Sequence, residues 1–169
     1  MYLHEVNIGD TFKVADVEFI KFTNDGDKVI TVAKDSLYDS RFGDAANFGK
    51  SDIKARLEKE LLPKLESEIG EENIFEFETD LLAFDGTRPF PNVKSKISLV
   101  TLDFYRQNRA IFDKHMLDDY WWLSTPDSET YKRIVLCVSP SGYVEYYNSC
   151  FCSNGVRPVL IFSSFISVS

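Results

Sequence analysis

Tyr120-Trp121-Trp122-Leu123-Ser124-Thr125-Pro126 is the stretch that decides the fold of this chain, and Gly155-Val156-Arg157-Pro158-Val159 completes it. Successive residues of a strand face opposite sides of a sheet. We therefore expect Trp121 and Trp122 on opposite faces, one in the core and the other half-exposed. Arg157 lies within an apolar strand pattern, where a buried guanidinium needs a carboxylate or carbonyl partners. We favour a salt bridge or a backbone clamp over a ligand contact at Arg157.

Between these stretches, residues 143–154 are rich in Tyr, Asn, Ser, Cys and Phe. Tyr supplies contact area at low entropic cost, and Ser and Asn supply adaptable hydrogen bonds, as in antibody binding loops. In a strand, alternation places Tyr143, Glu145 and Tyr147 on one face, with Val144 and Tyr146 on the other. Two interpretations stay open: a binding surface, and an aromatic hairpin packed on its own sheet.

The composition predicts one folded domain over residues 1–169. Hydrophobic residues make up 44% of the chain, which fits a globule rather than a disordered tail. The net charge of -8 argues against direct binding of nucleic-acid phosphates and favours contact with a basic protein surface. The three cysteines are an odd number and do not predict a disulfide-stapled secreted scaffold.

The sequence also predicts a chain that neither enters nor crosses a membrane. Met1 to Asp10 has no apolar core of a signal peptide. No apolar run reaches the roughly 18 to 20 residues that a membrane-spanning helix needs. We therefore expect no membrane partner and a cytoplasmic location.

The first half of the chain predicts a hairpin followed by a helix. Residues 11–22 alternate loosely, residues 24–27 (Asn-Asp-Gly-Asp) form a turn, and residues 29–33 are the return strand. Apolar residues then recur every four positions from a capping Ser51 to Gly70, which predicts a helix that Pro63 kinks or divides. The apolar positions are Ile53, Leu57, Leu61, Leu65 and Ile69.

The second half predicts a short strand, a second helix and a strand-rich C-terminal quarter. Thr101 is the expected cap of a helix that continues to about Lys114. The predicted strands are residues 97–99, 121–123, 134–138, 143–147 and 156–163, with a turn at residues 139–142. This order of hairpin, helices and clustered strands is typical of an α+β fold, with two helices packed on antiparallel sheets.

No motif predicts a reaction, a metal or a cofactor. Cys150 and Cys152 lack the partners of a zinc site, since His4 and His115 are the only histidines. A Cys–His pair between His115 and one of the three cysteines is formally possible, but no nucleophile signature surrounds any cysteine. Paired carboxylates such as Asp118-Asp119 are best interpreted as solvated surface charge, and the chain has no phosphate-binding loop.

The motifs resemble those of a known family. Residues 120–126, Ser141-Gly142 and residues 155–158 are similar to a family of uncharacterised domains common in gut bacteria and their phages, which end in a W-W-L-x-[ST]-P…G…G-V-R-P pattern. Residues 9–12 and 51–53 resemble this family too, so the likeness covers most of the chain. The family looks related to the C-type-lectin-like fold of formylglycine-generating enzymes and of the variable proteins of diversity-generating retroelements.

This resemblance implies a compact C-type-lectin-like domain and a ligand surface. The implied framework is Trp121, Trp122, Gly155, Arg157 and Pro158. In retroelement variable proteins the ligand surface precedes the final strand, which corresponds here to Tyr143, Glu145, Tyr147, Asn148, Ser149, Phe151, Ser153 and Asn154. Adenine-directed mutagenesis of asparagine codons yields Asn, Ser, Tyr, Cys and Phe among others, the types that dominate this segment apart from Glu145. Diversification of the segment is therefore a hypothesis.

The sequence thus predicts a phage- or prophage-encoded, non-enzymatic module that binds a protein or other macromolecule, in the host cytoplasm or on the virion. The alternative is a small acidic inhibitor of a host defence nuclease, similar in role to anti-CRISPR proteins, which the net charge motivates. An enzyme of unknown reaction is the third hypothesis. Formylglycine-generating enzymes are much longer and use a cysteine-based copper site whose motif this chain lacks, and fold kinship alone does not carry function.

Overall fold

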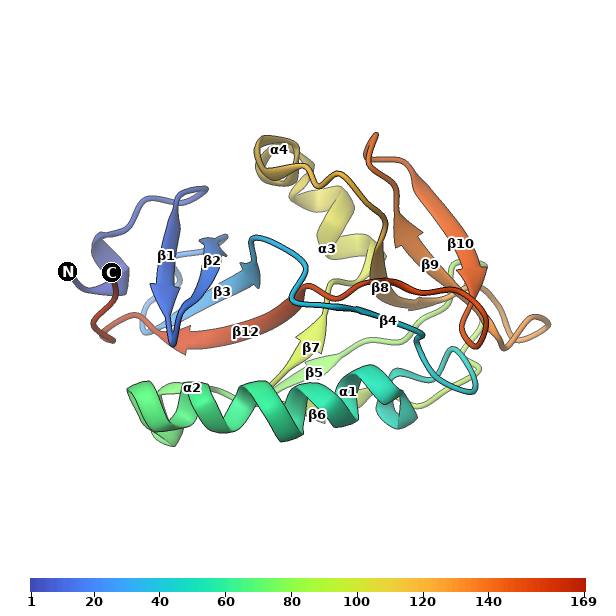
Figure 1. Cartoon of the computed structure of the whole chain (residues 1–169), viewed down its shortest axis with the longest axis horizontal. Helices are drawn as coiled ribbons and strands as arrows, with labels where there is room; N and C mark the ends of the chain where they lie inside the picture. Colours follow the sequence, from blue (N-terminus) through green and yellow to red (C-terminus); the bar gives the residue numbers. More distant parts are fainter.

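The computed structural model describes residues 1–169 and contains two five-stranded sheets, a two-stranded ribbon and helices on both sides (Figure 1). The first sheet consists, in spatial order, of β1 (Thr11–Val14), β2 (Val17–Lys21), β3 (Lys28–Ala33), β12 (Pro158–Ser163) and β7 (Ser98–Leu99). The second sheet consists of β10 (Val144–Asn148), β9 (Ile134–Val138), β8 (Trp121–Pro126), β11 (Asn154–Gly155) and β4 (Asp39–Ser40). The ribbon pairs β5 (Phe77–Thr79) with β6 (Val93–Ser95). The mixed content and largely antiparallel pairing confirm the predicted α+β class.

The N-terminal segment holds two hairpins where the sequence predicted one. Residues 11–22 are not a single strand, because β1 and β2 pair antiparallel around a turn at Ala15-Asp16. Both turn residues have positive φ, 49° and 65°, as a two-residue hairpin turn of type I′ requires. Alanine is a rare residue in that conformation, so the sequence pattern did not reveal the turn. The predicted turn at residues 24–27 is confirmed, with Gly26 at φ 60° between β2 and β3.

The first predicted helix is confirmed at both ends. The Ser51 hydroxyl accepts a hydrogen bond from the Lys54 amide at 3.0 Å, and Gly70 ends the helix with φ 89°. Pro63 divides it, since proline has no N–H for the carbonyl four residues earlier and a wider π-turn precedes it. The pieces are α1 (Asp52–Arg56), the π-helical η3 (Leu57–Leu61) and α2 (Leu62–Ile69), which run on as one rod in Figure 1.

The second helix is divided where the sequence predicted one continuous helix. Thr101 caps α3 (Leu102–Gln107) by accepting a hydrogen bond from the Phe104 amide at 3.1 Å. The helical path is interrupted at Asn108, whose side chain donates to the Phe104 carbonyl at 2.9 Å, and then continues in shorter turns close to the predicted end at Lys114. The short elements α4 (Arg109–Phe112) and η5 (Asp113–His115) follow, and the other 3₁₀ turns are η1 (Leu3–Glu5), η2 (Phe48–Lys50) and η4 (Glu71–Asn73). None of these helices is long and apolar enough to cross a bilayer.

Trp121 and Trp122 lie in different parts of the core. Trp121 packs against Tyr105 and Phe112 of α3 and α4, whereas Trp122 packs edge-on against Phe42. The expectation that one indole is half-exposed is wrong, since only 3% of Trp121 and none of Trp122 is exposed. The second sheet has α3 and α4 on one side and the α1–α2 rod on the other (Figure 1). It is therefore an inner layer, and both tryptophans are covered.

Arg157 clamps the two sheets together. Its Nε donates to the Ala33 carbonyl at 3.0 Å and an Nη to the Lys34 carbonyl at 2.8 Å, while the guanidinium lies 4.6 Å from the centre of the Trp121 ring. Continuing the β12–β3 register by one residue places Pro158 opposite Ala33. Because proline has no N–H, Arg157 supplies the missing donor. Burial lowers the pKa of Arg157 to about 10, and the interpretation of Arg157 as a backbone clamp is confirmed.

Candidate binding surface at strand β10

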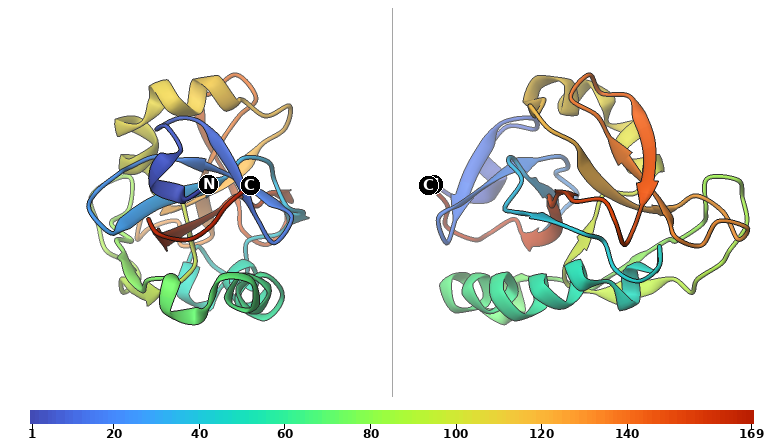
Figure 2. Two further views of the ribbon diagram at one scale, coloured as in Figure 1. Left: turned by 90° about the vertical axis from the view of Figure 1, so that its left-hand side faces the viewer. Right: turned by 45° about the vertical axis from the view of Figure 1, so that its right-hand side comes forward.

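β10 is the terminal strand of the second sheet. It pairs only with β9, in a register that runs from Val144 opposite Val138 to Asn148 opposite Ile134. Figures 1 and 2 show β10 at the margin of the molecule, far from the two chain termini. The predicted β9–β10 turn is present, and the Tyr105 hydroxyl holds it by donating to the Gly142 carbonyl at 2.6 Å. One flank of β10 therefore faces away from the rest of the fold.

The eight predicted site residues differ widely in exposure. The exposed ones are Tyr143 (73%), Phe151 (85%) and Ser153. The half-buried ones are Glu145, Tyr147 and Asn148. The buried ones are Ser149 (0%) and Asn154 (8%). In this conformation Ser149 and Asn154 leave almost no side-chain surface for a partner, so their contribution to the site is structural.

Tyr146 belongs to this surface although it was not predicted as a site residue. Alternation places it on the same face as Val144, opposite the buried Leu136, whereas the predicted site took Tyr143, Glu145 and Tyr147 from the other face. The tyrosine is nevertheless 67% exposed, while Val144 is half-buried against the core. β10 lies at the end of the sheet, so no further strand flanks the Tyr146 ring. Strand order is a long-range property that the local sequence does not carry.

The other face of β10 packs on the neighbouring strand segment. The Tyr147 ring lies edge-on to that of Tyr120, with ring centres 5.4 Å apart. The Tyr147 hydroxyl, and after it the Glu145 carboxyl, raise the pKa of Tyr120 to about 12. Oε2 of Glu145 is buried and has no hydrogen-bond partner. This face therefore combines an aromatic contact with a buried carboxyl oxygen close to Tyr120.

The loop after β10 has a tightly hydrogen-bonded conformation. Oδ1 of Asn148 accepts from the amides of Cys150 at 2.8 Å and Phe151 at 3.3 Å. The Asn148 carbonyl accepts from the Cys152 amide at 3.2 Å. Such side-chain bonds to the following backbone are typical of Asx turns. The loop thus presents Phe151 to solvent from a defined backbone.

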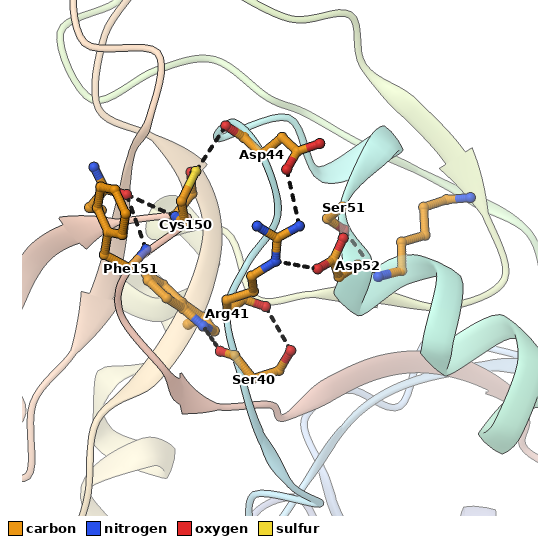
Figure 3. A network of polar contacts seen from close by, with 11 residues as sticks. Ser40, Arg41, Asp44, Ser51, Asp52, Cys150 and Phe151 are labelled. Atoms are coloured by element: carbon orange, nitrogen blue, oxygen red, sulfur yellow. Dashed lines mark hydrogen bonds and ion pairs between the residues drawn. The ribbon is translucent and has the colours of Figure 1, made fainter.

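The loop after β10 packs against a second loop, residues 41–44 (Figure 3). The Ser149 carbonyl accepts from the amides of residues 42 and 43, at 2.9 and 3.2 Å. The Cys150 thiol donates to the Asp44 carbonyl at 3.2 Å. Arg41 joins this loop to the start of α1, since its Nε donates to Asp52 at 2.6 Å. The loop that carries Phe151 is therefore fixed to the α1 end of the domain.

Neither Cys137 nor His115 has the surroundings of a catalytic Cys–His pair. Cys137 is fully buried, and burial, reinforced by the charge of Glu145, raises the pKa of its thiol to about 12. A nucleophilic cysteine requires the opposite shift. Nε2 of His115 contacts the Gly9 carbonyl at 2.8 Å and no cysteine. No group of three or more His, Cys, Asp or Glu side chains is placed to hold a metal ion.

Four of the five principal cavities lie away from the β9–β10 pair, and the fifth, of about 10 Å³, touches β9 at Val138. None of the five is lined by residues 143–154. One, of about 250 Å³, lies between residues 80–86 and α3, and its lining residues Asp103 and Arg106 form an exposed ion pair with each other. Small molecules usually bind in enclosed clefts. The surface at β10 therefore suits a macromolecule better than a small ligand.

Fold and surface together define this chain as an α+β protein whose second sheet ends in an exposed aromatic strand. No family model, curated protein or solved structure matches the chain. The likeness to the phage and gut-bacterial domains therefore rests on the sequence motifs, and the C-type-lectin-like assignment belongs with the proposals below.

Proposed function

We propose that this chain is a non-enzymatic binding module that recognises a protein partner through β10 and its flanking turn and loop. The observation that carries the proposal is the exposure of three large rings along this short segment. The rings, called the β10 aromatics below, are Tyr143 (73% exposed), Tyr146 (67%) and Phe151 (85%). Exposed aromatic side chains are the usual energetic anchors of protein interfaces, because each buries a large area on binding.

The surroundings of the β10 aromatics support the same role. Ser153 is exposed and Asn148 half-exposed beside Phe151, which provides a polar rim. Tyr147 and Glu145 lie behind the strand and hold its inner face. The hydrogen bonds of the loop fix its backbone before a partner arrives, which lowers the entropic cost of binding.

The proposed family is a phage or prophage family with a C-type-lectin-like fold, and the buried framework supports it. Arg157, Trp121 and Trp122 of the motif are all buried. Gly155 pairs with Trp121 where a Cβ would overlap Ser36, so glycine is required there. We further propose that the host cell or the virion is the place of action. A template repeat and a reverse transcriptase beside the gene would support diversification of residues 143–154, and their absence would count against it.

Affinity capture from host lysates tests the binding role. The full chain is compared with a variant that carries Tyr143→Ser, Tyr146→Ser and Phe151→Ser, and with the control variant Phe165→Ser. Phe165 is 65% exposed and close to the C-terminus, which Figure 1 places at the opposite end of the molecule. Proteins identified by mass spectrometry should be retained by the wild type and the control and lost with the triple variant. Equal retention by all three chains contradicts the proposal.

An acidic inhibitor of a host nuclease is the second candidate, and one surface favours it. Residues 66–80 contain no lysine or arginine and carry the exposed or half-exposed carboxylates Glu66, Glu68, Glu71, Glu72, Glu76, Glu78 and Asp80. Arg88 pairs with Asp80 and Lys94 lies opposite Glu78, so the unpaired acidic part of this surface is residues 66–76. Such a surface competes for the basic channel of a nuclease, with binding that weakens as salt rises. Glu68→Gln with Glu72→Gln should then reduce inhibition, while the triple variant of the β10 aromatics leaves it unchanged. The reverse result favours the β10 surface.

A further inference from the structure

The backbone of β10 points alternately toward β9 and toward solvent. The Ser139 amide donates to the Tyr143 carbonyl at 2.9 Å, and the Ser149 amide donates to the Arg133 carbonyl at 2.7 Å. In an antiparallel pair, hydrogen-bonded residues alternate with residues that turn their N–H and C=O outward. With the observed register, the residues bonded to β9 are 143, 145, 147 and 149, and the outward residues are Val144, Tyr146 and Asn148.

The outward groups of β10 are unused by the rest of the fold. β10 has no second neighbour in the sheet, and no hydrogen bond from another element reaches the N–H or C=O of Val144 or Tyr146. Only the Asn148 carbonyl is taken, by the Cys152 amide where the loop begins. The outer side of β10 therefore presents free N–H and C=O groups at Val144 and Tyr146. At each of these two residues, an added strand can form a pair of backbone hydrogen bonds.

The other sheet edges are short or closed. β7 and β4, the outer strands at the far ends of the two sheets, are two residues long each. β1, at the other end of the first sheet, is covered by the C-terminal segment, since the Lys13 amide donates to the Ser169 carbonyl at 2.7 Å. β10 is thus the long open edge of this fold, with five residues and no strand on its outer side.

Apart from Glu145, whose charged side chain turns to the inner face, β10 lacks the features that protect an edge strand. Natural edges carry lysine, proline or a bulge that blocks pairing. The sequence Val-Glu-Tyr-Tyr-Asn contains none of these residues, and its pairing with β9 is regular over all five residues. Tyr146 lies beside the open groups as an exposed ring, and such rings pair favourably with aromatic or β-branched residues of an adjacent strand.

Building on the binding role proposed above, we infer that β10 takes up an extended segment of a partner protein as a sixth strand of the second sheet. Backbone hydrogen bonds to Val144 and Tyr146 supply the pairing, and the β10 aromatics select the side chains. The segment is poor in Asp and Glu and carries a basic residue, because the chain that it joins carries a net charge of -8. The same charge on two copies disfavours pairing of β10 with itself.

Peptides selected from a displayed library of random twelve-residue sequences serve as the probe. The tightest binder is synthesised, and amide exchange is followed by NMR in the full chain with and without it. The Glu145 and Tyr147 amides should exchange slowly in both states, because they bond to β9. The Val144 and Tyr146 amides should exchange freely at first and at least about tenfold more slowly with the peptide. Unchanged exchange at Val144 and Tyr146 overturns the inference.

A matched pair of variants separates strand addition from contact through the ring. Tyr146→Ala keeps the outward N–H and removes the ring, whereas Tyr146→Pro removes both, and proline is tolerated at an outward position of an edge strand. The alanine variant should weaken peptide binding about tenfold, the proline variant about tenfold further, and Phe165→Ala less than about twofold. If the proline variant does not fold, the amide exchange of the wild type decides.

The remaining outcomes distinguish failure of the inference from failure of the proposed function. Equal binding by the proline and alanine variants, both weaker than the wild type, overturns strand addition and leaves the aromatic surface intact. Binding that neither variant weakens overturns both. A selection that returns no peptide dependent on β10 overturns the inference. Protection of Val144 and Tyr146 that rises with chain concentration in the absence of peptide shows that a second copy occupies the edge, which also overturns it.

Discussion

Replacing Cys137 with valine should change how stability depends on pH. The thiol is fully buried in β9, and its pKa is raised from 9.0 to about 12, first by burial and then by the charge of Glu145. A raised pKa means that the folded state keeps its proton at a pH where the unfolded thiol has lost it. The stabilisation is therefore complete below pH 9 and is lost as pH rises toward 12.

The size of this loss of stability follows from the titration of a single proton, that of the Cys137 thiol. Between the two pKa values the wild type should lose about 1.4 kcal/mol per pH unit, or about 2 kcal/mol at pH 10.5. Valine fills nearly the same volume, so at pH 7 the Cys137→Val variant should unfold within about 1 kcal/mol of the wild type. Other groups, such as Tyr38 with its pKa raised to about 12, titrate alike in both chains and cancel in the difference.

Urea unfolding of both chains at pH 7, 8.5, 9.5 and 10.5 measures the difference directly. Above pH 9, the free energy of unfolding of the valine variant should rise steadily relative to that of the wild type. Glu145→Gln, introduced into the chain that keeps Cys137, should narrow the pH range over which stability is lost. The reason is that the charge of Glu145 contributes to the raised pKa of the Cys137 thiol. A stability difference that does not change with pH refutes the burial of Cys137 as a neutral thiol.

Arg157→Lys keeps the buried charge but loses the planar fork that donates to both carbonyls and lies on the Trp121 ring, so the free energy of unfolding in urea should fall by about 1–3 kcal/mol; an unchanged value contradicts the clamp. Ser51→Ala removes the cap of α1 and should cost about 1 kcal/mol, measured as a lower Tm. Gly155→Ala should cost about 1–3 kcal/mol because its methyl overlaps Ser36, and Ser36→Gly should recover part of that loss in a double-mutant cycle. A cycle that shows no coupling between positions 36 and 155 argues against this close contact.

Local features of the fold could be predicted from the sequence because they depend on neighbouring residues. The cap at Ser51, the end at Gly70 and the division at Pro63 each follow from backbone chemistry within one or two turns. The predictions failed where a local signal was weak or misleading. The turn at Ala15-Asp16 lacks glycine, and the break at Asn108 depends on a side-chain hydrogen bond within an otherwise helical pattern.

The candidate site was predicted as a segment, and its details required the tertiary structure. Composition located residues 143–154, but exposure within them depends on which strands and loops lie nearby. Ser149 is buried because its loop packs on residues 42–43, a contact more than a hundred residues apart in the chain. Tyr146 is exposed because β10 has no outer neighbour. Periodicity predicts the face of a strand on which a residue lies, but not what covers that face.

Site-specific photo-cross-linking tests the binding surface most directly. The photoreactive residue p-benzoylphenylalanine replaces Tyr146 in one chain and Phe165 in another, two rings of nearly equal exposure at 67% and 65%. After irradiation in host lysate, the chain labelled at position 146 should form a discrete cross-linked product with a partner protein, and the chain labelled at position 165 should not. Cross-linking from position 165 alone, or to the same extent from both positions, contradicts a binding surface at β10.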